Sequence, residues 1–529
     1  MSFNLLNEPW VPVIMTDGTT TDLSLIECFE RAGEVRRISG DLPTQSFAIL
    51  RVLLAICHDA IGFHDLDEVA DLIDEGLPVD RVVEYLTALE GRFDLFDPKR
   101  PFFQVATLRT AKDEASPLNK LISDVPNGHP FMTTRGGEAL DCITAAEAAR
   151  WLIHAQAFDP SGIRSAAVGD PETSGGRGYP IGPSWVGQIG GIVLHGHTLA
   201  ETLTYNICPT PNDPKNRPVW AQEKPHTERR QMEPAPAGPV ELLVWQSRRI
   251  RLVGDRDGVT GVVLAQGDKM TPQNRQDIEH MTAWRYSKPQ TKKFGIDVYM
   301  PLEHDPARSA WRGVPNLLGS AGLNDVGKEA SLPPETIITL QSIDAGDADL
   351  PLTVTVEAVG LMYGPQNAVI EELVNDSLDL RLGILGEKSG AVRVMVNDAV
   401  QLADTCVWQL GNFASNLVAA AGDFDGIEGA KDHAMFLGWS AIDDAAREWL
   451  AGLSESTDTI EAMREWQQVL RAALTGVAVR LAADSSPAAV TGRLTKRGFM
   501  TAAKAESIYH GVLRKELPLA YPKQKEQAS

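Results

Sequence analysis

The sequence lacks paired cysteines, long apolar runs and an excess of positive charge, and each absence excludes a class of protein. Its five cysteines are scattered, with no Cys-x-x-Cys pair, which is typical of reduced thiols and argues against a disulfide framework. The longest apolar run, residues 47–57, contains Arg51 and has about half of the ~20 residues that a membrane span needs. The first residues carry no basic segment followed by an apolar one. We therefore expect a cytoplasmic protein with no signal peptide and no membrane partner.

The overall charge is strongly negative. The chain has 49 lysines and arginines against 71 aspartates and glutamates, which gives a formal net charge of −22. Such a chain is not expected to bind nucleic acid freely, because attraction to phosphates requires a basic surface. One window, residues 284–293, is nevertheless basic and contains aromatic residues. Contact with nucleic acid is therefore expected to be local, or to depend on partners.

Common catalytic motifs are also missing. The sequence contains neither a Gly-x-Ser-x-Gly elbow nor a His-Glu-x-x-His pair. Residues 175–182 resemble a phosphate-binding loop but lack the Gly-Lys-Ser/Thr ending, so a plain surface loop is favoured. His304 and Asp305 could form half of a metal or acid–base site, but no second pair accompanies them at a usable spacing. A metal- or nucleotide-dependent enzyme that uses these residues is one alternative, and a scaffold with no DNA role is another.

Periodicity predicts an α+β fold of two parts. In the first part, residues 44–61 and 78–90 have the apolar spacing of helices, and Thr144 with Glu147 predicts a capping box. Residues 238–264 are expected to form short strands, and residues 350–360 alternate as a strand does before a turn at 363–367. A hairpin or a strand–turn–helix is expected there. We assign residues 1–378 to a large mixed N-terminal domain with long binding loops.

The last part of the chain has the pattern of long helices. Apolar residues recur at three- and four-residue spacing over 392–417 and again over 460–481, the second run following a cap at Asp458. Further helical stretches are expected at 440–453 and 486–517. Four helices of this kind predict an antiparallel bundle, which we assign to residues 379–529.

The segment from Phe131 to Gly191 is expected to be a binding surface. It holds an aromatic-tipped turn, a short helix and a long run rich in glycine, proline and serine. Long loops of this composition in compact domains are usually functional or disordered, and they are expected to contribute little to a core. No nucleophile–base pair or metal cage lies near it in the sequence, so we expect binding and no catalysis.

In their order along the chain, several segments resemble the large subunit of the type I-E CRISPR Cascade surveillance complex, the CasA family. The resemblance extends over nearly the whole chain, although no single motif is unique. It rests on Phe3–Val13, Arg100–Gln104, the Phe131 turn with the following Gly137–Leu140, Ser174–Gly178, the basic window 284–293 and the turn around Gln366.

The resemblance implies a subunit that cuts nothing and needs no cofactor. In this family the subunit recognises the short motif that flanks a protospacer in double-stranded DNA, begins duplex opening and helps to recruit the helicase-nuclease. Phe131, Met132 and Thr133 match the loop that anchors the subunit near the guide-RNA handle, among the other Cascade subunits. The glycine loop matches Ser161 and Gly162, the lysine finger matches Lys288, and the glutamine wedge matches Gln366.

The sequence departs from the family pattern in two places. Thr133 stands where relatives carry asparagine, and Ser161 stands where they carry glycine. Some relatives also have a cysteine cluster shortly before the lysine finger. Residues 258–267 contain no cysteine here, so no zinc or other metal is expected.

Overall fold

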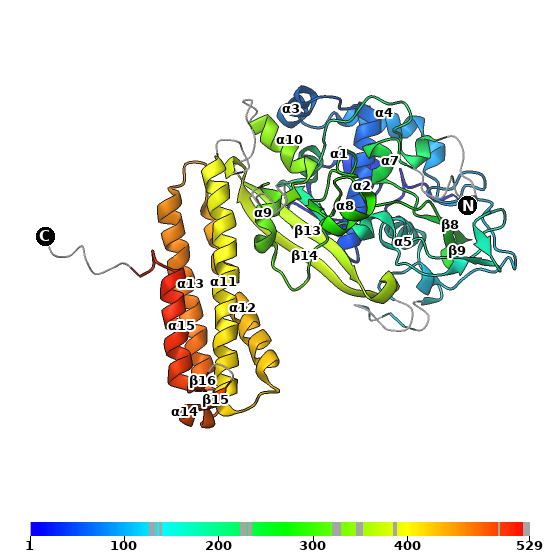
Figure 1. Cartoon of the computed structure of the whole chain (residues 1–529). Helices are drawn as coiled ribbons and strands as arrows, with labels where there is room; N and C mark the ends of the chain where they lie inside the picture. The colour runs from blue at the N-terminus through cyan, green and yellow to red at the C-terminus, as the bar shows by residue number, and fades with distance from the viewer. Residues whose placement is uncertain are drawn as a thin grey trace. The chain divides into compact units, whose positions relative to one another are not determined.

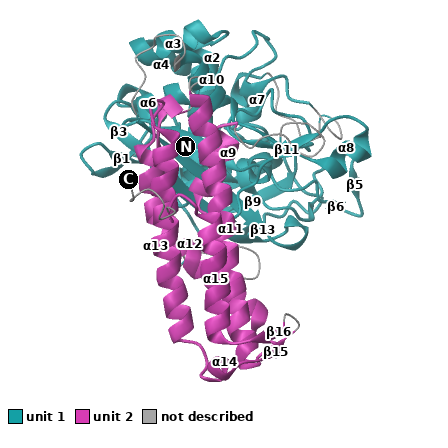
Figure 2. Cartoon of the chain, turned by 60° about the vertical axis from the view of Figure 1, so that its left-hand side comes forward, with its two compact units in different colours: residues 1–308, 322–377 teal, residues 309–321, 378–529 magenta. Residues whose placement is uncertain are grey.

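The computed structural model describes residues 2–125, 133, 135–136, 140–222, 230, 235–319, 330–344, 353–384, 389–495 and 498–521. The chain forms two compact units, which Figure 2 distinguishes by colour. Unit 1 comprises residues 1–308 and 322–377, and unit 2 comprises residues 309–321 and 378–529. Unit 1 mixes helices with antiparallel strands, whereas unit 2 is almost entirely helical. The predicted α+β fold class is confirmed.

The helices of unit 1 are mostly short. They are α1 (Leu25–Glu30), α2 (Pro43–Ile61), α3 (Leu66–Glu75), α4 (Val79–Ala88), α5 (Ala145–Phe158), α6 (Leu199–Tyr205), α7 (Pro239–Leu243), α8 (Lys288–Phe294) and α10 (Glu335–Asp344). The predicted helices at 44–61 and 78–90 are confirmed as α2 and α4.

The described strands of unit 1 pair into small antiparallel sheets with the orders β2-β1-β3, β4-β6-β5, β8-β9, β11-β10-β12 and β14-β13-β7. The long hairpin of β13 and β14 stands out in Figure 1. The strands are β1 (Val11–Met15), β2 (Thr20–Leu23), β3 (Val35–Ile38), β4 (Arg164–Ser165), β5 (Thr173–Ser174), β6 (Arg177–Gly178), β7 (Gly191–His195), β8 (Arg248–Asp255), β9 (Gly258–Gln266), β10 (Trp284–Tyr286), β11 (Tyr299–Pro301), β12 (Ser331–Leu332), β13 (Thr353–Tyr363) and β14 (Ile370–Arg381), which continues into unit 2.

Helix α2 forms the centre of the unit 1 core. Pro43 starts it, since a missing N–H costs nothing at the first helical position, and Gly62 ends it with φ +74°. Among the described residues α2 is the one helix long and apolar enough to cross a membrane, and 78% of its most apolar window is buried inside the protein. Its side chains pack with α5 in one hydrophobic cluster. These properties are those of a core helix.

A fully buried ion pair crosses this core. Arg51 on α2 donates to both carboxylate oxygens of Glu279, at 2.8 and 2.9 Å, and each side chain is only 1% exposed. Trp185 adds a third hydrogen bond to Glu279, at 2.6 Å. Burial raises the pKa of Glu279, but the charge of Arg51 and the hydrogen bonds from Arg51, Trp185 and the Met281 amide together outweigh it, and the pKa is lowered. The pair therefore stays ionised and joins three distant parts of the chain.

Two local predictions for unit 1 were wrong. Residues 239–243 form the helix α7 and no strand, because the hydrogen-bonded side chain of Asn216 caps the amides of Val240 and Glu241. The capping box at α5 is only half formed. The Thr144 hydroxyl accepts from the amide of Glu147, whereas the Glu147 carboxylate pairs with Arg135, at 2.5 Å.

Unit 2 is built on four long helices that pack together, as Figure 1 shows. They are α11 (Gly390–Ala421), α12 (Ile427–Gly452), α13 (Thr459–Ala483) and α15 (Ala502–Glu516). The apolar stripe predicted for α11 is buried, and Asp458 caps α13 as expected. The stripe predicted for α13 is buried in its middle, from Trp466 to Val477, but Ile460 at its start is 64% exposed. Trp466 fixes the register of α13 on α11 by donating its indole N–H to the carbonyl of Ala399, at 3.0 Å.

Two features of unit 2 differ from the expectation. Residues 486–517 are not one helix, because α14 (Ala488–Thr491) ends at Gly492, with φ +74°, and the hairpin β15 (Arg493–Thr495) and β16 (Gly498–Met500) precedes α15. Residues 309–321, which include α9 (Val314–Leu317), also belong to this unit. Trp311 attaches them by packing on Trp466 and donating to Asp443, at 2.9 Å.

Replacing Glu279 with alanine is expected to lower the free energy of unfolding by about 3–5 kcal/mol, because the charge of Arg51 would be left buried and unpaired. Urea unfolding of the purified chain measures this. The matched control is Glu34→Ala, which breaks the exposed pair with Arg31 and should change stability by less than about 1 kcal/mol. Equal losses in the two variants would contradict the role assigned to the buried pair.

Candidate nucleic-acid interface

The loop that follows α5 is held by one shared carboxylate. Asp159 accepts hydrogen bonds from Arg248, at 2.5 Å, and from Arg164, at 2.6 Å. Arg248 also donates to the carbonyls of Asp159, Pro160 and Gly182, at 3.1, 3.2 and 2.8 Å. Burial lowers the pKa of Arg248 and the nearby Asp159 acts in the opposite direction. The two ends of a long irregular segment are thereby fixed to the start of β8.

Ser161 and Gly162 lie at the start of this fixed loop. Ser161 is buried, and its amide donates to the carbonyl of Asn367, at 2.8 Å. The carbonyl of Gly162 accepts from Gln266 on β9, also at 2.8 Å. A Cβ added at Gly162 would approach Arg164 only to 3.5 Å, which is an ordinary contact. The fold itself therefore does not require glycine at 162, and any such requirement would come from a bound molecule.

Gln366 sits at the tip of the β13–β14 hairpin in a strained conformation. Gln366 and Asn367 have φ values of +60° and +55°, the left-handed region that non-glycine side chains rarely adopt. The turn is closed by the amide of Asn367 on the carbonyl of Gly364, at 2.9 Å. Below it, the half-buried Tyr363 donates its hydroxyl to the carbonyl of Phe158, at 2.8 Å. The exposed Gln366 side chain thus projects from a rigid support.

A cleft of about 270 Å³ lies between these two elements. The loop 159–165 forms one wall, Ala368–Ile370 at the start of β14 forms another, and the short 3-10 turn Leu118–Lys120 forms a third. Lys120 and Arg164 bring positive charge to the lining. Burial lowers the pKa of Lys120, and the nearby Arg164 acts in the same direction. The glycine loop and the residues that directly follow the Gln366 turn, which are far apart in the sequence, therefore line one concave surface.

Lys288 belongs to a different segment of unit 1. It is the exposed first residue of α8, between β10 and β11, where Lys292 and Lys293 occupy the last turn. Thr291 secures the helix by accepting from the amide of Val298, at 2.9 Å. The structure thus joins Ser161, Gly162 and the Gln366 turn directly, and it places Lys288 on a separate exposed helix.

Of the predicted handle-binding residues, Phe131 and Met132 lie outside the described part of the chain. Thr133 is described, and its hydroxyl accepts from the amide of Arg135, at 3.1 Å. Arg135 in turn pairs with Asp124, at 3.2 Å, and with Glu147. Burial raises the pKa of the Asp124 carboxyl, although Arg135 opposes the rise. These ion pairs fix the chain just after the predicted aromatic turn.

The residues that the alternative enzyme function would use contact other parts of the chain. His304 contacts the carbonyl of Gly191, at 2.9 Å, and burial lowers its pKa, while Asp305 accepts from the amide of Ala307. Gly175 and Gly176, with φ values of +59° and +73°, form the two-residue turn between β5 and β6. Within the described ranges no group of three or more His, Cys, Asp or Glu side chains could hold a metal ion.

Sequence reasoning missed the residues that support the site. Asp159, Arg248 and Tyr363 were not singled out, although the arginines at 248 and 249, within a strand-like apolar run, were a usable signal. Trp185, Val186 and Ile189, which follow the glycine-rich run in the sequence, belong to the core of unit 1.

The Gln366 backbone strain gives a direct prediction about stability. Gln366→Gly should be more stable than Gln366→Ala by about 1 kcal/mol, because glycine adopts positive φ without a steric cost and alanine does not. Thermal unfolding of the two variants, which both lack the amide side chain, measures the difference. If the alanine variant were equally stable, the turn would not be strained.

Comparison with known proteins gives a consistent result. The family model "CRISPR-associated protein Cse1" matches residues 4–477. A "CRISPR-associated protein CasA/Cse1" from Thermus thermophilus is 32% identical over 274 residues, which span 49% of this chain and 50% of that relative's length. The crystal structure of Thermobifida fusca Cse1 has a TM-score of 0.89 and 40% identity, covering 98% of this chain and 99% of that one. A chain of a "CRISPR RNA-guided surveillance complex" shares the fold, with a TM-score of 0.73, 17% identity and coverage of 97% and 99%.

Proposed function

This chain belongs to the CRISPR-associated Cse1 (CasA) family, and we propose that it is a non-catalytic subunit of a type I-E Cascade RNA-guided surveillance complex. In that complex it recognises the short motif flanking a target in double-stranded DNA and starts to open the duplex. Its partners are the other Cascade subunits, the guide RNA, the target DNA and the helicase-nuclease that it helps to recruit, and its place is the cytoplasm.

The observation that carries this proposal is the hydrogen bond from the Ser161 amide to the Asn367 carbonyl. It joins the loop that would approach the flanking base pairs to the turn that would separate the next ones. A duplex held at Ser161 and Gly162 would therefore meet the exposed Gln366 side chain directly beyond the flanking motif. A wedge cannot open DNA alone, because unstacking one step costs a few kcal/mol, so pairing with the guide RNA supplies the rest.

Lys288 is proposed to read the flanking motif from the minor groove. That groove presents similar acceptors for A·T and T·A pairs, so a single ammonium donor there would tolerate several motifs. The net charge of −22 fits a division of roles between this subunit, which would read the motif, and its partners, which would bind phosphates. An acidic subunit leaves general phosphate capture to its partners and does not become trapped on unrelated DNA.

Phe131, Met132 and Thr133 are proposed to anchor the subunit near the guide-RNA handle. Support comes from the ion pairs of Arg135, which hold the chain in place two residues beyond Thr133. Aromatic side chains are typical interface anchors.

Gln366→Ala in the assembled complex should slow strand opening about tenfold on intact duplex, equivalent to about 1.4 kcal/mol on the barrier. It should have no effect on targets already mismatched beside the flanking motif. A fluorescent base analogue at the first protospacer positions follows the opening. Asn367→Gly is the matched control, because it changes the same turn and keeps the Gln366 side chain. Equal slowing on intact and pre-opened targets would leave Gln366 as a plain turn residue.

Lys288→Ala should weaken binding to targets with a good flanking motif by about 1–3 kcal/mol, and binding to targets with a bad motif much less. Equilibrium binding of the complex to the two targets at one fixed salt concentration measures this. Lys293→Ala, on the same short helix, is the matched control and should affect both targets alike. An equal loss on both targets with Lys288→Ala would show that Lys288 contacts only phosphates.

A further inference from the structure

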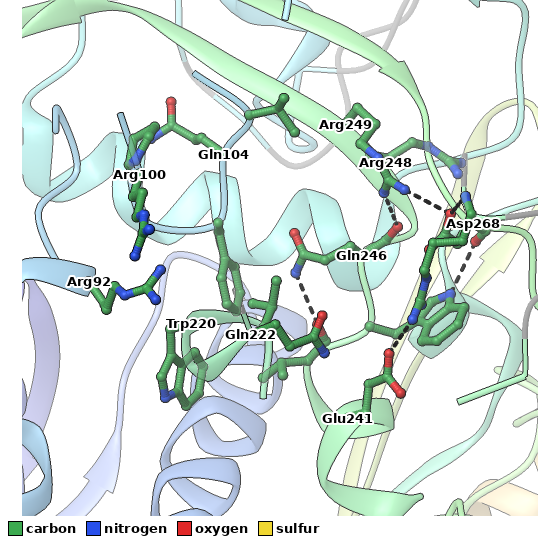
Figure 3. Close-up of a pocket in the computed structure, with 17 residues that line it drawn as sticks. Arg92, Arg100, Gln104, Trp220, Gln222, Glu241, Gln246, Arg248, Arg249 and Asp268 are labelled. Atoms are coloured by element: carbon green, nitrogen blue, oxygen red, sulfur yellow. Dashed lines mark hydrogen bonds and ion pairs between the residues drawn. The ribbon is translucent and has the colours of Figure 1, made fainter. Parts of the chain in front are cut away.

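Unit 1 contains a second pocket that the proposed function does not use. It lies between the segment 92–105, the stretch Val219–Gln222 and the start of β8, and it has a volume of about 90 Å³ (Figure 3). Its lining includes five arginines but only two carboxylates, Glu241 and Asp268. Such a concentration of positive charge is unexpected in a chain with a net charge of −22.

At one end of this pocket the charges are compensated. Arg230 pairs with Glu241 and with Asp268, both at 2.5 Å, and Arg249 pairs with Asp268, at 2.8 Å. The nearby guanidiniums lower the pKa of Asp268 in spite of its burial, which by itself would raise it. Figure 3 shows these contacts as dashed lines on one side of the pocket. This end is a closed ion-pair network with no charge left to bind an anion.

At the other end two arginines face the pocket without a carboxylate. Arg92 is half-buried and Arg100 is exposed, and Figure 3 shows both side chains directed into the same end. Within the part of the chain that the structure describes, neither guanidinium has an ion pair. Burial lowers the pKa of Arg92, and the like charge of Arg100 lowers it further. Two adjacent cations that repel each other form a site to which an anion would bind favourably.

The backbone beside Arg100 is strained and clamped. Phe103 has φ +56°, an outlier for a bulky side chain, and its ring stacks on Phe102 at 4.3 Å. Gln104 holds the segment by donating to the carbonyl of Leu95 and accepting from the amide of Leu252, at 2.8 and 2.7 Å. Backbone strain of this kind persists only where the surroundings enforce it, and such residues cluster at binding sites. This clamp gives a physical role to the motif Arg100–Gln104.

The size of the pocket limits the ligand. A volume of about 90 Å³ is several times the ~30 Å³ share of one water molecule and well below the ~300 Å³ of a small-molecule site. It suits a compact group of a few heavy atoms. Guanidinium pairs match the geometry of tetrahedral oxyanions, which accept two parallel N–H bonds from each fork.

We propose that Arg92 and Arg100 form a binding site for a phosphate group, at a place separate from the loops that would recognise DNA. The phosphate is either inorganic phosphate or the phosphodiester of a nucleic-acid strand, and the chemistry of the site is the same for both. Phe103 and Trp220, whose rings stack at 6.1 Å, form the apolar wall that keeps the charges partly shielded from water.

Isothermal titration calorimetry of the full chain with sodium phosphate, at constant ionic strength in chloride, tests the site. Arg92→Gln and Arg100→Gln should each weaken phosphate binding about tenfold, and the double variant should abolish it. A thymidine dinucleotide, which carries one phosphodiester, tests the second source. Tighter binding of the dinucleotide than of phosphate, lost in the double variant, identifies a nucleic-acid strand, and the reverse order identifies free phosphate.

The control Arg31→Gln removes an exposed arginine elsewhere and should leave binding unchanged. In the absence of phosphate, Arg92→Gln should keep or raise the Tm at low salt, because it relieves repulsion from Arg100. A marked fall in Tm would show that Arg92 pairs with a carboxylate of the chain itself, and it would overturn the proposal. So would the absence of binding to the wild-type chain, or equal binding by the double variant.

Discussion

The carboxylate of Asp159 is the interaction on which the candidate DNA surface depends. Two arginines share it, and one of them, Arg248, also binds the carbonyls of Pro160 and Gly182 at either end of an irregular segment. A loop with so little secondary structure would otherwise sample many conformations, at a cost of about 1–2 kcal/mol per residue to order. A buried charge network adds to the few hydrogen bonds of the small β4-β6-β5 sheet, and it lies next to the residues proposed to touch DNA.

The site combines this rigid base with one strained turn. Tyr363 and the Ser161 amide fix the hairpin from below, while Gln366 and Asn367 are held at positive φ at its tip. The backbone of the turn is therefore fixed at the position from which the Gln366 side chain projects. The arginine pair at 92 and 100 has the same design, with Phe103 as the strained residue and Gln104 as the clamp. Both are cases in which the fold prepares a site at a small cost in stability.

The sequence was informative where periodicity or order along the chain carries the information. The long helices of unit 2, the core helix α2 and the family followed from spacing and from the ordered motifs, and they are confirmed. The sequence was uninformative where the local structure depends on a residue that is distant in the chain. A helix forms at 239–243 because Asn216 caps it, the loop after α5 is ordered because Arg248 reaches it, and residues 309–321 join unit 2 through Trp311. No local pattern contains those partners, so neither the half-formed cap at Thr144 nor the contact of Ser161 with Asn367 was predictable.

The contacts that hold the loop after α5 join residues that are far apart in the sequence, and this has a consequence for biosynthesis. Asp159 and Arg248 are 89 residues apart, and Ser161 waits for a carbonyl at Asn367, beyond two-thirds of the chain. Domains begin to fold while the ribosome is still adding residues, but contacts between remote segments must wait until both exist. A nascent chain that has not yet reached β14 therefore cannot have assembled the surface that we propose for DNA. The proposed DNA surface can therefore be completed only late in synthesis, shortly before the long helices α11 to α15 of unit 2 are made.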